Sequence, residues 1–141
     1  MEIAIGSDHA GFELKEQVIA YLKSKSIVVL DKGTYSLERA DYPDHGHAVA
    51  KEVLDKKILG IVICGSGNGI NMSVNKHKGI RGALCWNSEI TALARQHNDA
   101  NIMALPARFM NIEEAKKCVD AFITEKFEGG RHQDRVLKIE C

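Results

Sequence analysis

The chain has 141 residues, of which 45% are hydrophobic and 27% charged, and its nineteen basic residues balance nineteen acidic ones. This length predicts one domain, residues 1–141, large enough to bury a core without disulfides or a metal. The zero net charge argues against nucleic acid or an anionic membrane as a partner, because both attract proteins with an excess of positive charge.

The four cysteines, at positions 64, 85, 118 and 141, predict free thiols rather than a disulfide or zinc framework. None belongs to a CxxC pair, and none stands at metal-ligand spacing from a histidine. The N-terminal segment lacks the basic start and long apolar stretch of a secretory leader. These features predict a cytoplasmic protein without a metal site.

Short apolar runs alternate with amphipathic segments along the chain. In residues 12–23, Leu14, Val18 and Leu22 recur every four residues, which predicts a helix with one apolar face. Residues 58–63 are apolar without alternation, the pattern of a central parallel strand covered on both faces. We expect further strands at 3–5, 27–30, 82–85 and 101–105, and further helices from Pro43, at 88–96, at 112–126 and after Gly129-Gly130. The alternation predicts a single α/β domain with a doubly wound parallel sheet.

In such sheets the ligand site lies at the carboxyl ends of the strands, where the strand order reverses. For the common strand order 2-1-3-4-5, the reversal falls between the first and third strands. The loops that follow these strands are Ser7-Asp8-His9 and Cys64-Gly65-Ser66-Gly67-Asn68-Gly69. Topology therefore places the two most chemically suggestive loops of the chain side by side.

The loop that begins at Cys64 combines a thiol with three glycines between a strand and a helix. The glycines let several backbone N–H groups converge, and the positive end of a helix favours an anion and a thiolate. Such a loop can hold a phosphate or stabilise an oxyanion. It does not match G-x-G-x-x-G or a cysteine phosphatase loop, because Ile70 stands where these need Gly and Arg, and it lacks the lysine of a P-loop. A tight turn with a core cysteine explains the same residues equally well.

Other polar residues are ambiguous when taken singly. Asp8 and His9 suit a hydroxyl and an anion, but Asp8 also suits a helix cap. His97 closes a predicted helix, and we expect it near the carboxyl end of another strand, as a catalyst or as a partner of the helix dipole. The remaining histidines with no interpretable context are treated as surface residues: His45, His47 and His77.

The arginines are concentrated in the second half of the chain. Five of the six follow residue 80, and residues 61–110 hold five basic against two acidic residues. Arg131 and Arg135 lie four apart, so on a helix they share one face, which suits a phosphate or a solvated pairing with Glu128 or Asp134. The neutral total thus conceals a local positive region suited to one small phosphate.

Taken together, these segments resemble the ribose-5-phosphate isomerase B family, which also includes galactose-6-phosphate isomerase subunits. The matching segments span almost the whole chain in family order: Gly6–Phe12, Asp41–Pro43, Ile63–Ile70, Asn75-Lys76 with Gly79–Arg81, Arg95–Asn101 and Gly129–His132. The resemblance implies a Rossmann-like fold and a homodimer or dimer of dimers, with a site completed across the interface. It implies interconversion of ribose 5-phosphate and ribulose 5-phosphate, a step of the pentose phosphate pathway, through a cis-enediolate and without metal or cofactor.

The resemblance also implies roles for individual residues. Cys64 is the expected base, Ser66 the shuttle for the hydroxyl proton, and His97 the group that opens the furanose ring with help from Asp8. The backbone N–H groups of residues 65–69 would stabilise the enediolate. Substrate binding is expected from His9, Tyr42, Gly65, Gly67, Asn68, Gly69, Asn98, Arg108, Arg131 and Arg135. Of these, His9 and the arginines would hold the phosphate, some of them from a partner subunit.

Three other functions remain open at this point. The same chemistry could act on a six-carbon sugar phosphate such as allose or galactose 6-phosphate. A non-catalytic module could use the glycine loop only to bind a sugar phosphate. A Cys–His hydrolase would form a covalent intermediate at Cys64, although no triad spacing supports it.

Overall fold

One sheet of five parallel strands forms the centre of the computed structural model, which describes residues 1–141. The strands are β1 (Glu2–Ser7), β2 (Val28–Asp31), β3 (Leu59–Cys64), β4 (Gly82–Leu84) and β5 (Ile102–Pro106). Parallel neighbours need long crossover connections, and helices supply them here. The helices are α1 (Phe12–Ser24), α2 (Tyr42–Lys56), α3 (Asn68–Val74), α4 (Ser88–Asn98), α5 (Ile112–Thr124) and α6 (Arg131–Leu137), with a short 3-10 turn η1 (Ala107–Phe109) after β5.

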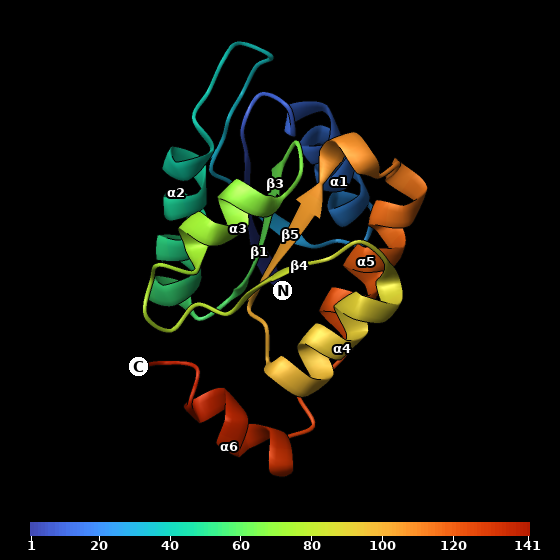
Figure 1. The fold of residues 1–141 in the computed structure, drawn as a ribbon. Coiled ribbons are helices and arrows are strands. Elements are labelled where there is room, and N and C mark those ends of the chain that lie inside the picture. Colours follow the sequence, from blue (N-terminus) through green and yellow to red (C-terminus); the bar gives the residue numbers. More distant parts are fainter.

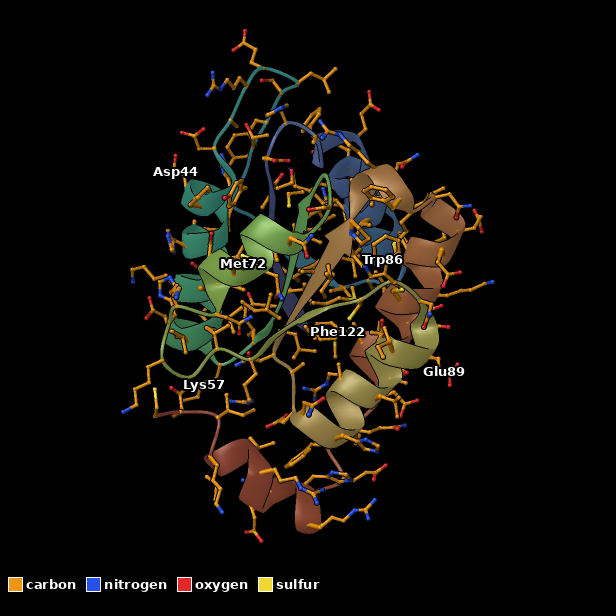
Figure 2. All side chains as sticks on the ribbon, in the orientation of Figure 1. Asp44, Lys57, Met72, Trp86, Glu89 and Phe122 are labelled. Carbon is orange, nitrogen blue, oxygen red and sulfur yellow. The ribbon has the colours of Figure 1, made fainter.

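The helices cover both faces of the sheet (Figure 1). Helices α1 and α5 pack on one face, with α4 against α5, while α2 and α3 pack on the other. The strands divide their side chains accordingly: Ile3 and Ile5 of β1 belong to the core under α1 and α5, and Ala4 between them belongs to the core under α2 and α3. Phe122 of α5 is buried in the first of these cores (Figure 2). This arrangement confirms the predicted doubly wound, Rossmann-like α/β fold.

The strand order is β2-β1-β3-β5-β4, so the expected order 2-1-3-4-5 is wrong at one edge. All five residues of β5 are buried, whereas the three residues of β4 are only half-buried. The fully apolar strand therefore takes the interior place beside β3, and the short one forms the edge. The reversal between β1 and β3 is as predicted, because β3 pairs with β1 on one side and β5 on the other.

The register brings three strand ends to one edge of the sheet. Ser7 of β1 pairs with Ile63, and the next residue, Cys64, pairs with Pro106 of β5. The loops after β1, β3 and β5 consequently begin side by side at the carboxyl edge.

None of the six helices is both long enough and apolar enough to cross a membrane.

Candidate active site

The loop between β3 and α3 carries backbone donors without an acceptor in the chain, next to a thiol. Cys64 is 4% exposed at the end of β3. The N–H groups of Gly65, Ser66, Gly67 and Gly69 have no acceptor within the chain, while the N–H of Asn68 donates to Ser66 Oγ at 3.2 Å. Free N–H groups gathered in one loop form an anion-binding concavity. Four N–H groups of the loop after Cys64 are therefore available to a ligand.

Glycine is required where this loop turns into α3. Gly67 has φ +76°, a left-handed conformation that other residues rarely adopt. A methyl group on Gly67 would also lie 2.5 Å from Leu84 Cδ1 and 3.2 Å from the backbone of Leu105. Packing against β4 and β5 thus leaves no room for a side chain at this position.

Asp8 and His9, in the loop after β1, lie against the same strand end. Asp8 donates its N–H to the carbonyl of Ile63 at 3.3 Å, and its buried carboxylate accepts from the N–H of Gly11 at 3.0 Å. The carboxylate therefore closes the turn before α1, as the cap interpretation anticipated, although Gly11 is the residue at the cap position. Nδ1 of His9 lies 3.2 Å from both the N–H and the carbonyl of Ala40, which holds the ring in place.

Tyr42 and Arg108 complete this group from two further elements. The ring of Tyr42, at the start of α2, packs so closely on Gly69 that a methyl group there would lie 2.6 Å from it. Arg108 follows β5, donates its N–H to the carbonyl of Gly65 at 2.9 Å, and makes no ion pair with any acidic residue. Its Nη1 lies 3.0 Å from the position that a Gly65 methyl group would occupy. A free cation thus faces the loop that carries the unused donors.

His97 lies at the opposite edge of the sheet, and its expected place near the carboxyl end of a strand is wrong. His97 and Asn98 end α4, which runs back along the sheet and leads into the amino end of β5 (Figure 1). Arg131 and Arg135 lie on α6, beside this end of α4. One chain therefore divides the predicted site residues between two edges of its sheet.

The two arginines of α6 are exposed and form no ion pair, so the alternative pairing with Glu128 or Asp134 is absent. His132, between them in sequence, was not among the predicted site residues. Its ring stacks on that of His97, with centroids 4.2 Å apart and planes 11° apart. Burial of the ring, and then the neighbouring His97 and Arg131, hold the pKa of His132 below its ordinary value. Two signals could have indicated its place: the family-like segment Gly129–His132 and the neighbouring arginines.

The histidines treated as surface residues are not equivalent. His45 and His77 are half-buried and His47 is exposed, and Nδ1 of His45 lies 3.0 Å from the carbonyl of Lys32. His47 and His77 are in mutual contact, Nδ1 to Nε2 at 2.7 Å, near the surface.

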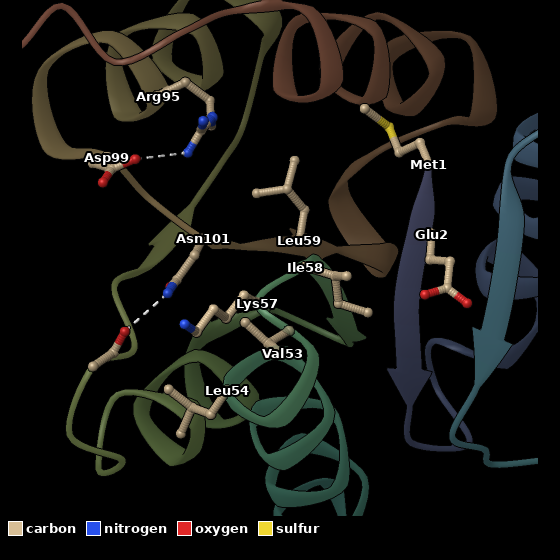
Figure 3. Close-up of a pocket in the computed structure, with 11 residues that line it drawn as sticks. Met1, Glu2, Val53, Leu54, Lys57, Ile58, Leu59, Arg95, Asp99 and Asn101 are labelled. Atoms are coloured by element: carbon tan, nitrogen blue, oxygen red, sulfur yellow. Dashed lines mark hydrogen bonds and ion pairs between the residues drawn. The ribbon is translucent and has the colours of Figure 1, made fainter.

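The largest cavity, about 670 Å³, lies away from the glycine loop (Figure 3). It is at the amino edge of the sheet, where Glu2, Leu59 and Asn101 mark the starts of three strands. Its Arg95 and Asp99 are paired with each other at 3.2 Å. It contains no thiol, and its walls are largely aliphatic, so we do not assign it to the chemistry.

Comparison with known proteins shows the family of the chain. The model of the Ribose/Galactose Isomerase family matches residues 3–139. The chain belongs to this family. It is 46% identical to ribose-5-phosphate isomerase B of Escherichia coli, over 98% of this chain and 93% of that one.

Solved structures of the same family share the fold over nearly the whole chain. A ribose 5-phosphate isomerase from Thermotoga maritima is 48% identical, with a TM-score of 0.97 over 99% of this chain and 97% of that one. A ribose-5-phosphate isomerase B from Mycoplasma genitalium, solved with bound ribulose-5-phosphate, is 45% identical, with a TM-score of 0.93 over 98% and 93%. The resemblance inferred from the sequence motifs is confirmed.

Proposed function

We propose that the chain is an aldose–ketose isomerase that interconverts ribose 5-phosphate and ribulose 5-phosphate. Relatives that carry the name ribose-5-phosphate isomerase B match nearly its full length, and one of them was solved with ribulose-5-phosphate bound. The observation that carries the proposal is the row of free N–H groups beside Cys64, because the reaction needs stabilisation of a negatively charged oxygen next to a base. Residues 1–141 would form one such catalytic domain, acting in the cytoplasm.

The isomerisation moves one carbon-bound proton and one hydroxyl proton. The Cys64 thiolate removes the proton from C2 of the aldose, and the carbonyl oxygen at C1 gains the negative charge of the enediolate. The N–H groups of Gly65, Ser66, Gly67 and Gly69 stabilise that charge as it develops, at no cost of reorganisation. The Ser66 hydroxyl carries the hydroxyl proton from O2 to O1. Cys64 then returns its proton to C1, so the thiolate is regenerated.

Substrate binding is divided between the two edges of the sheet. At the carboxyl edge, Arg108 and His9 supply cationic or donor groups for the phosphate, and Tyr42 and Asp8 border the sugar hydroxyls. Asn68 would form the wall beside the enediolate. These groups lie around one loop, which supports a single binding site there.

The remaining predicted groups reach this site in our proposal from a second copy of the chain. His97 would open the furanose ring with Asn98 beside it, and Arg131 and Arg135 would complete the phosphate site. The supporting observation is that these residues lie at the amino edge, on the exposed α6 and the end of α4. A homodimer, or a dimer of dimers, that sets this edge against the glycine loop of its partner would assemble the full set.

The substrate is tested by comparing kcat/KM for ribose 5-phosphate with that for allose 6-phosphate and galactose 6-phosphate. The proposal predicts that ribose 5-phosphate has the highest value. A higher value for either six-carbon sugar would reassign the substrate. Binding of all three without turnover would instead indicate a non-catalytic binding module.

A further inference from the structure

Three potential metal ligands converge where α4 ends and α6 begins. Nε2 of His97 lies 3.9 Å from Oε1 of Glu128, and Nε2 of His132 lies 3.6 Å from the same oxygen. The three ligand atoms all lie within 4.8 Å of one another. No other group of three such side chains in the chain is as close.

The backbone around these side chains is anchored. Glu128 donates its N–H to the carbonyl of Gln96 at 3.0 Å, and the Gln96 side chain donates to Glu125 Oε2 at 2.7 Å. These bonds join the last turn of α4 to the segment before α6, and Figure 1 shows α6 below the end of α4. His132 is 8% exposed, and its N–H donates to the carbonyl of Gly129 at 3.0 Å. The three ligands are therefore held together by bonds that do not involve the ligand atoms.

Two imidazole nitrogens and one carboxylate oxygen form a donor set typical of Zn²⁺ and its neighbours in the first transition row. We propose that His97, Glu128 and His132 form a binding site for a divalent transition-metal ion, with water in the remaining position.

Ion binding requires only local movement of these side chains. Metal–ligand bonds of about 2.0–2.2 Å in a tetrahedron place the ligand atoms roughly 3.3–3.5 Å apart, close to the two carboxylate distances. The imidazole rings must leave their stacked arrangement, because the ion has to lie in the plane of each ring. His97 and Glu128 have room for this turn, since their side chains are 37% and 52% exposed. Arg131 and Arg135 on the same helix oppose the added positive charge, which limits the affinity without blocking the site.

Metal binding has a consequence for turnover that rests on the proposed function. A nitrogen that holds Zn²⁺ no longer exchanges a proton, so an ion on His97 would prevent this residue from opening the sugar ring. We therefore expect Zn²⁺ to inhibit the isomerisation reversibly. The metal site itself does not depend on that function.

Calorimetric titration of the full-length chain with Zn²⁺ tests the site directly. We expect one strong Zn²⁺ site per chain. A sample loaded with Co²⁺ should show the visible absorption spectrum of a four-coordinate ion. Glu128→Gln and His132→Gln should each weaken Zn²⁺ binding at least about 100-fold, since even the loss of a hydrogen-bond partner behind a metal ligand costs about 10- to 100-fold. The matched controls are His77→Ala, which removes the other histidine pair, and Cys141→Ser, which removes the exposed thiol.

Unchanged Zn²⁺ affinity in Glu128→Gln and His132→Gln, or loss of binding in either control, would overturn the site. So would the absence of any strong Zn²⁺ binding by the wild-type chain. A parallel assay follows ribose 5-phosphate turnover with added Zn²⁺ and then a chelator. The proposal predicts inhibition of the wild type, recovery with the chelator, and resistance in His132→Gln, whereas inhibition through the Cys64 thiol would persist in that variant. A chain that binds Zn²⁺ but isomerises nothing would refute the proposed function and leave the metal site standing.

Discussion

The division of the site between two edges of the sheet predicts that two inactive variants can restore each other. β3 has six residues and runs from the amino edge of the sheet to its carboxyl edge, so at about 3.3 Å per residue its first and last Cα atoms lie roughly 17 Å apart. A catalytic group must come within about 3 Å of the proton that it moves. Cys64 at one edge and His97 at the other therefore cannot serve the same substrate molecule within one chain.

We expect Cys64→Ala and the double variant His97→Ala/Arg131→Ala each to be inactive alone. When equal amounts are mixed under conditions that allow subunits to exchange, about half of the dimers contain one chain of each kind. Each mixed dimer has one site with both defects and one intact site, so activity should return to about a quarter of the wild-type value. Turnover of ribose 5-phosphate before and after mixing is the assay. No recovery, with exchange verified by a mass-tagged chain, would refute the division of the site between subunits.

Three further predictions concern single residues. Gly65→Ala should raise KM for ribose 5-phosphate about 10- to 150-fold by displacing the Arg108 guanidinium, which contributes roughly 1.5–3 kcal/mol as a charged hydrogen-bond donor. Arg108→Ala should raise KM to the same extent, and an additive effect in the double variant would contradict this explanation. Burial raises the pKa of Cys85 to about 11, so the native state holds this proton more tightly than the unfolded state does, and stability should fall as pH rises from about 9 to 11. Urea unfolding should show a fall up to about 2 kcal/mol larger in the wild type than in Cys85→Ala, and equal slopes would exclude Cys85 as the cause. Lys15 has a fully buried side chain whose Nζ lies 2.8 Å from Asp31. Lys15→Met should therefore lower the free energy of unfolding by about 2 kcal/mol, less than for a fully buried pair because Asp31 is partly exposed. Lys15→Met/Asp31→Asn should recover part of this loss, whereas equal stability of Lys15→Met and the wild type would contradict the prediction.

Local pattern was sufficient to predict the elements of this fold and the place of its main loop. The apolar run before Cys64 is the buried centre of the sheet, and Asp8 of the loop after β1 is hydrogen-bonded to it at Ile63. The order of β4 and β5 was not predictable from periodicity. It depends on which of the two strands is more completely buried by its neighbours in the folded sheet.

The position of His97 shows a different limit. A residue that closes a helix just before a strand lies at the amino edge of a parallel sheet, so the order of the motifs was sufficient to contradict the expected place of His97 near the carboxyl end of a strand. The contacts of His132 and Glu128 with His97 were not predicted, because they arise only when the segment after α5 folds back against the end of α4. Residues that meet through such contacts between distant segments have no characteristic spacing in the sequence.

The central claim is that Cys64 moves the carbon-bound proton. Proton NMR of ribose 5-phosphate in D2O, with the wild type and with Cys64→Ala, tests it most directly. The wild type should form ribulose 5-phosphate and incorporate deuterium at the exchanging carbon. Cys64→Ala should lower both rates about 100- to 10,000-fold, the contribution of a positioned general base, while its circular dichroism and its binding of the sugar phosphate remain unchanged. Near-normal isomerisation and exchange by Cys64→Ala would contradict the account.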